Sequence, residues 1–383
     1  MSATTPSSEL KPSNTVELAE ILGADDRPLE PIAGGSKRTI GRPVDAEPLW
    51  LGEMSGIIDY RPAELVLSAQ AATPLADIQL LLAESRQRFA FEPPDLGILL
   101  GISTVDEPRH PVSATIGGVL AANLSGSRRI AAGAARDHFL GVTAVNGQGE
   151  TFKAGGKVVK NVTGYDLPKL LAGSWGSLAV MSEVTLKVVP DPETELTLIV
   201  PNEGPAEAVG VLSLALGSAH DVSSAGFDPW RGAALRLEGI PASVAARESA
   251  LLKELGNPEV ERLEAEASRT FWMHLAGARA LAEWRVVWRI SVPPSDAPRI
   301  IGAIAPERYL LDWGGGLIWA AYNQVDSHRV RGSLRDGHAM LIKAPNDSRT
   351  CRQHPPSAAM AQVLDRLKSA FDPDGRLNPG RMD

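Results

Sequence analysis

The segment TFKAGGKVVKNVTGYDLPKLLAGSWGSLAVMSEVTLKVVP occupies residues 151–190 and carries the most informative pattern in the chain. It predicts a strand, a glycine turn at Gly155 and Gly156, a polar loop, a short helix over 167–171, a glycine-rich turn and a strand over 178–189. A loop with so little side-chain bulk lets a flat ligand approach the backbone closely. Taken alone, the pattern is equally typical of a sharp surface hairpin.

Residues 30–190 hold four loops that are poor in large side chains, and they include the GGSKR run at 34–38 and the small-residue run at 113–129. Successive backbone N–H groups in a glycine turn can bind an anion, and Lys37 and Arg38 add positive charge. By itself the first loop favours an exposed glycine hairpin, because neither GxxxxGK[ST] nor GxGxxG is present. Four such loops together indicate one long, flat ligand with a pyrophosphate and a planar ring, as in a dinucleotide cofactor.

The composition limits the classes of protein that need to be considered. A chain of 383 residues is long enough for two or three domains, and its net charge of -8, without a stripe of Lys and Arg, predicts no nucleic-acid partner. Cys351 is the only cysteine, which excludes an intramolecular disulfide and a cysteine-held iron–sulfur cluster within this sequence.

Membrane and targeting signals are weak. No apolar run approaches the roughly 20 residues that span a bilayer, and the first residues lack the basic and apolar regions of a signal peptide. We therefore expect a cytoplasmic protein with no direct membrane span. Peripheral attachment to the inner face of the plasma membrane, through partners, stays open.

Several longer motifs occur in a fixed order, and together they resemble a known family. They are AGGSKRTIGRP, FEPPDLG, ATIGGVLAANLSGSRR, AARDHFLG, GGKVVKNVTGYDLPKLLAGSWGSL and FDPDGRLNPGRMD. The chain resembles, over nearly its whole length, the FAD-linked oxidases of the vanillyl-alcohol oxidase type. Within that type it is most similar to the family of second flavin subunits (E subunits) of bacterial glycolate oxidases.

The resemblance implies an α+β fold. A flexible arm over residues 1–13 would precede an FAD-binding domain over 14–190, built of two α+β subdomains. A smaller α+β domain with an antiparallel sheet would follow over 191–370, as a cap that contacts substrate or a partner, and a tail over 371–383 would return to the FAD domain.

The resemblance also implies where FAD lies. The first loop would wrap the pyrophosphate, the second would pass beside the ribityl and phosphate groups, the third would run along the cofactor, and the fourth would line the adenine end or the edge of the flavin. The residues of these four loops are, in order, Ala33, Gly34, Gly35, Ser36, Lys37 and Arg38; Thr115, Ile116, Gly117 and Gly118; Ser125 and Arg129; and Gly176, Ser177, Leu178 and Val180. Relatives with a covalent flavin often carry a histidine in the first loop, and since this chain has none there, we expect non-covalent FAD.

The C-terminal half of the sequence offers few candidate catalytic or metal-binding residues. Catalytic relatives carry HGDGNxH-like histidine pairs that hold a metal; this chain has no such motif, so we expect no metal site. His338 is the best candidate for a base that accepts a hydroxyl proton, although a lone histidine is more often structural. Lys343, Arg335 and Arg381 are candidate clamps for a carboxylate.

The resemblance implies an FAD-binding subunit of a glycolate (2-hydroxy acid) oxidase or dehydrogenase complex, which takes part in electron transfer while glycolate is oxidised to glyoxylate. Its partners would be a second flavin subunit and an iron–sulfur subunit, and the single cysteine fits clusters held elsewhere. Two alternatives remain open: a stand-alone FAD-dependent oxidase or dehydrogenase of another hydroxy acid or alcohol, and a non-catalytic scaffold subunit.

Overall fold

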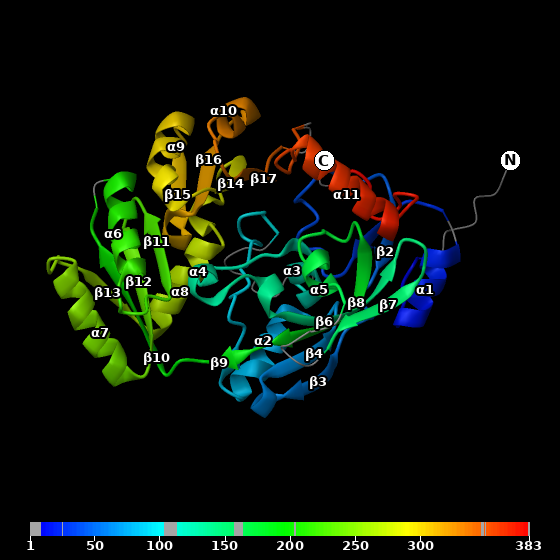
Figure 1. Cartoon of the computed structure of the whole chain (residues 1–383), viewed down its shortest axis with the longest axis horizontal. Helices are drawn as coiled ribbons and strands as arrows, with labels where there is room; N and C mark the ends of the chain where they lie inside the picture. The colour runs from blue at the N-terminus through cyan, green and yellow to red at the C-terminus, as the bar shows by residue number, and fades with distance from the viewer. Residues whose placement is uncertain are drawn as a thin grey trace.

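The computed structural model describes residues 9–24, 26–102, 113–156, 164–202, 204–345, 348 and 350–381. The run KVVKNVT at 157–163, which belongs to the most specific motif of the sequence, lies outside the described residues, as do the first eight residues of the expected arm. Figure 1 shows two bodies of mixed helix and strand, joined through β9 and packed side by side.

The N-terminal body is built on a five-stranded antiparallel sheet with the order β3-β4-β8-β6-β7. A short parallel pair, β1 and β2, lies beside it, and β5 pairs with β9. The strands are β1 (Leu29–Ile32), β2 (Glu47–Trp50), β3 (Ile57–Arg61), β4 (Val66–Gln70), β5 (Gln87–Arg88), β6 (Phe139–Asn146), β7 (Thr151–Gly155), β8 (Ala179–Lys187) and β9 (Val189–Pro190). The helices are α1 (Thr15–Ala24), α2 (Leu75–Glu84), α3 (Ile116–Ala122), α4 (Arg129–Ala132) and α5 (Leu167–Leu171).

The central strands of this sheet are buried on both faces, because successive side chains of a strand point to opposite sides. Ala144 and Met181 join the core formed with α2 and α3, whereas their neighbours Val145 and Val180 join a second core with α1. The strand that follows the glycine-rich turn of residues 173–177 is therefore fixed from both sides.

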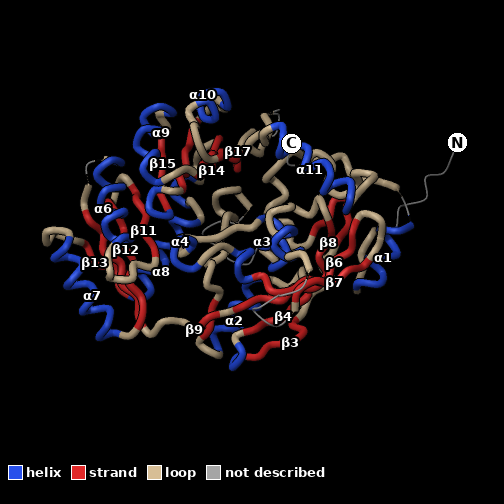
Figure 2. The backbone as a smooth tube through the Cα atoms, in the orientation of Figure 1, coloured by secondary structure: helices blue, strands red, loops and turns tan. Residues whose placement is uncertain are grey.

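The C-terminal body is an eight-stranded antiparallel sheet with the order β13-β10-β12-β11-β15-β16-β14-β17. Figure 2 shows this sheet standing apart from the N-terminal one, with helices α6, α7 and α9 along its outer face. Its strands are β10 (Thr194–Val200), β11 (Ser224–Asp228), β12 (Gly232–Gly239), β13 (Glu261–Glu264), β14 (Val286–Ser291), β15 (Arg308–Asp312), β16 (Leu317–Tyr322) and β17 (His338–Lys343). Its helices are α6 (Pro205–Gly217), α7 (Pro241–Glu254), α8 (Ala265–Ala276), α9 (Ala297–Ile304) and α10 (Ser327–Gly332).

Each strand of the large sheet divides its side chains between two cores. Trp288 and Ile290 pack outward with α6 and α9, whereas Val287 packs inward with α8 and with residues of the N-terminal body such as Leu96 and Leu124. We call the side that faces α8 and the N-terminal body the inner face. It forms the contact between the two bodies.

The last part of the chain crosses back to the N-terminal body. Helix α11 (Ala358–Phe371) lies over that body (Figure 1), and Lys368 Nζ donates to the carbonyl of Ser177 at 2.6 Å. The Arg376 guanidinium donates to the carbonyls of Leu22 and Gly147 at 2.8 and 3.0 Å. A residue near the C-terminus thus joins two segments that are far apart in the sequence.

Candidate cofactor site and inner-face cluster

Three of the four predicted loops contact one another beside the five-stranded sheet. Gly35 forms a parallel bridge with Ser113, which joins the first loop to the second. The N–H groups of Gly173 and Trp175 donate to the carbonyls of Leu120 and Ala121 at 3.1 and 2.9 Å, which joins the glycine-rich turn to α3. The sequence pattern alone does not predict these contacts.

Glycine is required where the first two loops meet. A Cβ built on Gly34 would lie 1.8 Å from the carbonyl oxygen of Ser113, a distance that only glycine permits. Gly35 has φ of +70°, in the left-handed region. The close approach fixes the conformation of the turn that follows.

That turn offers hydrogen-bond donors without acceptors. Among the described residues, none accepts a hydrogen bond from the backbone N–H of Ser36 or Lys37. Burial lowers the pKa of Lys37 to about 8, against the opposing effect of Asp95, and its ammonium contacts the Ser36 hydroxyl at 3.2 Å. Two free N–H groups beside a desolvated ammonium fit the negative charge of a diphosphate.

The side chain of Arg38 is engaged within the protein. It donates twice to the Glu30 carboxylate, at 3.0 and 2.7 Å, and its guanidinium lies 5.9 Å from the ring of Trp50. Arg381, from the tail, also contacts Glu30 and donates to the carbonyls of Lys37 and Arg38. The tail therefore stabilises the first loop through hydrogen bonds from Arg381.

The N-terminus of α3 makes its hydrogen bonds to the protein itself. Thr115 accepts from the N–H of Gly118 at 3.3 Å, and the N–H groups of Ile116 and Gly117 donate to the carbonyls of Thr73 and Ala71. A Cβ on Gly117 would lie 2.7 Å from the Ala71 carbonyl oxygen, so this glycine is needed for packing. The Ile116 side chain is fully buried in the core, which leaves only its backbone to face a ligand.

The glycine-rich turn is held by the tail. Trp175 and Gly176 have φ of 55° and 70°, and Asn378 Nδ2 donates to the Trp175 carbonyl at 2.8 Å. Ser177 donates from its hydroxyl to the Ser174 carbonyl at 2.6 Å. The side chains of Leu178 and Val180 pack on the two hydrophobic cores, and so any approach of a ligand here is to the backbone.

Ser125 and Arg129 lie in a segment that connects the two bodies. The Ser125 hydroxyl accepts from the N–H of Ala135 at 2.9 Å and is buried. Arg129 extends to the large sheet, where its guanidinium carbon lies 4.8 Å from the centre of the Trp313 ring. Of the residues predicted for the cofactor, Arg129 is the one whose side chain contacts the inner face of the other body.

A second arginine contacts the same tryptophan. The guanidinium carbon of Arg289, on β14, also lies 4.8 Å from the Trp313 ring centre. Burial, and then Arg129, lower the pKa of Arg289 to about 10, against the opposing effect of Asp312. Partial desolvation of the imidazole, and then Arg289, also lower the pKa of His338 at the start of β17. Sequence analysis missed Arg289, and the available signal was a charged residue inside the apolar strand VVWRIS.

The carboxylate clamps expected from the sequence are not brought together. Lys343 donates to the carbonyl of Ala282, and Arg381 is bound to Glu30 and the first loop. Arg335 is exposed in the turn before β17. The cations that do converge near His338 are Arg129 and Arg289.

Trp313 is fixed in place by the protein around it. Its N–H donates to Asp312 Oδ1 at 2.7 Å, and its indole Nε1 donates to the Gly126 carbonyl at 3.0 Å. Asp312 is fully buried, and its other oxygen accepts from the Ser127 hydroxyl at 2.7 Å. Burial raises the pKa of Asp312 to about 7, so this carboxyl is only partly ionised at neutral pH.

Other arginines at the contact between the two bodies form ion pairs with glutamates. Arg236 is 2% exposed and donates to both oxygens of Glu92 from the N-terminal body, at 2.9 and 2.6 Å. Glu238 contacts Arg88 at 2.6 Å and Arg128 at 3.3 Å. These ion pairs link the two bodies and fix the inner face against the loops of the N-terminal body.

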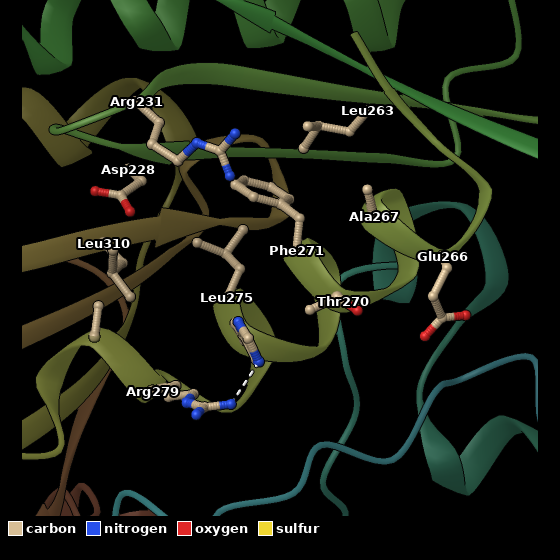
Figure 3. A pocket seen from close by; sticks show the side chains of 12 residues that line it. Asp228, Arg231, Leu263, Glu266, Ala267, Thr270, Phe271, Leu275, Arg279 and Leu310 are labelled. Carbon is tan, nitrogen blue, oxygen red and sulfur yellow. Dashed lines mark hydrogen bonds between the residues drawn. The ribbon is translucent and has the colours of Figure 1, made fainter. Parts of the chain in front are cut away.

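A separate cavity of about 500 Å³ lies between α8 and the end of the large sheet. Figure 3 shows Arg231 over Phe271 on one side, and Arg279 with its hydrogen bond to His274 on the other. Arg231 also forms an ion pair with Glu261 at 2.6 Å. None of the site residues predicted from the sequence lines this cavity.

Among the described residues, no group of three or more His, Cys, Asp and Glu side chains is arranged to hold a metal ion. In the same part of the chain, no helix is both long and apolar enough to cross a bilayer.

Comparison with known proteins agrees with this geometry. Residues 6–155 match a family model described as an FAD binding domain. Solved structures of alkyldihydroxyacetonephosphate synthase share the fold, with a TM-score of 0.65 at 13% identity over 96% of this chain and 76% of theirs. The chain is thus an FAD-binding protein of the FAD-linked oxidoreductases, and the α+β fold of the vanillyl-alcohol oxidase type expected from the sequence is confirmed.

Individual relatives show to which family of FAD-linked oxidoreductases the chain belongs. Glycolate oxidase subunit GlcE of Escherichia coli (strain K12) is 34% identical over 368 residues, which cover 94% of this chain and 93% of the relative. Glycolate oxidase subunit GlcD of Bacillus subtilis (strain 168) is 30% identical over 203 residues, or 51% of this chain and 39% of the relative. The chain belongs to the family of glycolate oxidase E subunits.

Proposed function

We propose that this chain is the FAD-binding subunit of a glycolate (2-hydroxy acid) oxidase or dehydrogenase complex and takes part in electron transfer as glycolate is oxidised to glyoxylate. The observation that carries the proposal is the similarity to a glycolate oxidase subunit over almost the full length of both chains. The cofactor supplies the two-electron acceptor that such an oxidation needs. The partners we propose are a second flavin subunit and an iron–sulfur subunit, and the second of these accords with a chain that has a single cysteine.

The first loop is the part of the chain to which we assign the diphosphate of FAD. The N–H groups of Ser36 and Lys37 are the available donors, and the Lys37 ammonium adds charge next to them. At Gly117, Gly118, Gly176 and the residues after them, we propose that FAD lies against the backbone alone. The side chains there are absent, packed in the core or already hydrogen-bonded. No histidine or cysteine lies in the first loop, which supports non-covalent binding.

The cofactor assignment is tested by spectroscopy and titration. The purified chain should show flavin absorbance, and acid precipitation should leave the flavin in the supernatant. Lys37→Gln should weaken FAD binding about tenfold or more, since one charge-assisted contact contributes about 1.5–3 kcal/mol. The exposed Lys153 on β7 provides the control, and Lys153→Gln should bind FAD as the unaltered chain does. A chain that cannot be loaded with FAD would refute the assignment.

The role in a complex needs a second experiment. The chain is co-expressed with the proteins encoded beside it, and glycolate-dependent reduction of an artificial acceptor is measured for the purified assembly with and without this chain. We expect activity only when the FAD-loaded chain is present. Full activity of an assembly that lacks the chain, or contains it without FAD, would contradict the proposal.

His338 is the residue we propose as acceptor of the hydroxyl proton. It lies on the inner face at the start of β17, and partial burial followed by Arg289 lowers its pKa, which favours the neutral imidazole that can accept a proton. His338→Gln should lower kcat by about 100-fold or more, in the range typical of general base catalysis. His328, exposed on α10, provides the control, and His328→Gln should leave kcat unchanged.

The stand-alone alternative has one observation in its favour. His338, Arg129 and Arg289 all belong to this chain and influence one another's charge. If the chain turns over without partners, glycolate or another 2-hydroxy acid should bleach the flavin spectrum of the isolated, FAD-loaded chain. Bleaching that requires the partner subunits would favour the complex.

A further inference from the structure

Arg289 lies on β14, between β16 and β17, on the inner face of the large sheet. Arg289 pairs with Trp319 on β16 and with Met340 on β17, so the three side chains lie next to one another on the same face. Trp319 is buried in the core between the two bodies. Arg289 therefore faces the N-terminal body.

Arg129 approaches from that body. Both guanidinium carbons lie 4.8 Å from the centre of the Trp313 ring, so they are within twice that distance of each other. We call Arg129 and Arg289 the arginine pair. Trp313 is only 6% exposed and is bonded through both of its N–H groups, so it holds the pair in a defined geometry.

Among the described residues, the arginine pair has no carboxylate as an ion-pair partner. Within the described part of the chain, no carboxylate lies within ion-pair distance of either guanidinium, although Arg236 on the same face and Arg88 and Arg128 from the N-terminal body all contact glutamates. Asp312 acts on Arg289, but burial raises its pKa and it already accepts two hydrogen bonds. Asp137 acts on Arg129, but it is paired with Arg136 at 3.8 Å. Two like charges brought together without a counter-ion raise the energy of the folded protein.

We propose that the arginine pair is a subsite for the carboxylate of a small 2-hydroxy or 2-oxo acid, held across Trp313 and next to His338. The ligand supplies a negative charge that none of the described carboxylates places within ion-pair distance of the two guanidinium groups. Guanidinium groups match the planar carboxylate and can bind it through two parallel hydrogen bonds. The choice of a 2-hydroxy acid rests on the proposed function, whereas the choice of a carboxylate rests on the charges of the inner face.

In this subsite the two guanidinium groups would bind the acid directly. A metal ion would neutralise a carboxylate by direct coordination, and two arginines provide the same positive charge through hydrogen bonds. His338, on the same strand and face as Met340, lies at the edge of the arrangement. The proton acceptor that we propose is thus next to the group that would orient the acid.

The test measures binding directly on the purified, FAD-loaded full chain. Oxalate, a small dicarboxylate with no hydroxyl group to be oxidised, is titrated by calorimetry, with Trp fluorescence as a second readout. We expect Arg289→Met to weaken oxalate binding about tenfold to hundredfold, since it removes a charge-assisted contact, and Arg289→Lys to be intermediate. Arg285 is exposed just before β14, and Arg285→Met should bind oxalate like the unaltered chain.

Two further measurements separate a binding role from a structural one. Removal of an uncompensated charge should leave the melting temperature of Arg289→Met unchanged or raise it, and FAD content should stay the same. A lower melting temperature with unchanged oxalate binding would overturn the proposal. Arg129→Met should weaken oxalate binding as well. If this variant instead binds FAD less tightly but oxalate normally, Arg129 is not part of the subsite and the proposal is refuted.

Other outcomes distinguish this inference from the proposed function. Inorganic phosphate that binds as tightly as oxalate would overturn a carboxylate subsite. If the FAD-loaded chain supports glycolate oxidation in the assembly but binds no oxalate, the subsite is refuted and the proposed function stands. If oxalate binding depends on Arg289 but the assembly does not oxidise glycolate, the subsite stands and the proposed function is refuted.

Discussion

Replacement of Gly34 by alanine is the most direct perturbation of the cofactor loops. The added Cβ would lie 1.8 Å from the Ser113 carbonyl oxygen, and ordinary contacts begin at 3.4 Å. The two loops must therefore separate by about 1.6 Å. Because the obstacle is backbone on both sides, no side-chain rotation relieves the contact.

Two effects of Gly34→Ala can be estimated. Forced separation of packed backbone is a form of overpacking, which costs about 1–3 kcal/mol of stability. It also moves the N–H groups of Ser36 and Lys37, and loss of one charge-assisted hydrogen bond to a phosphate weakens binding by about tenfold to hundredfold. We expect FAD affinity to fall by at least that factor while much of the chain remains folded.

The assay is titration of the apo-chain with FAD, followed by the quenching of flavin fluorescence, together with thermal unfolding of each variant. Gly52 is the matched control, since a Cβ there would meet nothing within 4 Å, and Gly52→Ala should bind FAD normally. FAD affinity of Gly34→Ala within about twofold of the unaltered chain would refute the reasoning, because the first loop would then not depend on its contact with Ser113.

Three further predictions concern the contacts that hold the two bodies and the tail. Glu92→Gln should cost about 3 kcal/mol, because it leaves the buried charge of Arg236 without its main partner, whereas Glu261→Gln at an exposed ion pair should cost under about 1 kcal/mol; urea midpoints measure both. Burial would raise the pKa of Glu238, but the arginines around it lower that pKa to about 2. The ionised carboxylate therefore stabilises the protein by about 3 kcal/mol above about pH 5, and this contribution is lost as the pH falls toward 2. Acid unfolding should accordingly show a flatter dependence of stability on pH for Glu238→Gln. Asn378→Ala removes the hydrogen bond to the glycine-rich turn and should weaken FAD binding several-fold without a change in the assembly of subunits, as titration and gel filtration would report.

The cofactor loops are the part of the site that the sequence predicts well. A run such as Gly34–Arg38 has a recognisable composition because the requirement for close backbone approach is local. What the sequence does not contain is the partner of each loop. Gly34 is needed because of Ser113, and Gly117 because of Ala71, and both partners are set by how the sheet and α3 pack.

Candidate substrate contacts are harder to predict for the same reason. Lys343 and Arg381 have the right charge, but the first is bound to a carbonyl and the second to Glu30. Arg289 becomes important only because β16 and β17 lie on either side of β14, in a register that places Trp319 and Met340 next to it. Strand order and register depend on contacts that are distant in sequence, and one sequence read alone does not reveal them.

The arginines between the two bodies fall into two groups, those that form ion pairs with glutamates and the arginine pair at Trp313. Arg236 has Glu92, and Arg88 and Arg128 have Glu238, so these three hold the two bodies together without a ligand. The arginine pair at Trp313 also lies at the interface, but no glutamate of the described residues is its ion-pair partner, and burial raises the pKa of the nearby Asp312. A protein that needed only to join its two bodies would gain stability from an apolar residue in place of Arg289. The unbalanced charge is therefore best understood as the half of an ion pair whose other half is a bound acid.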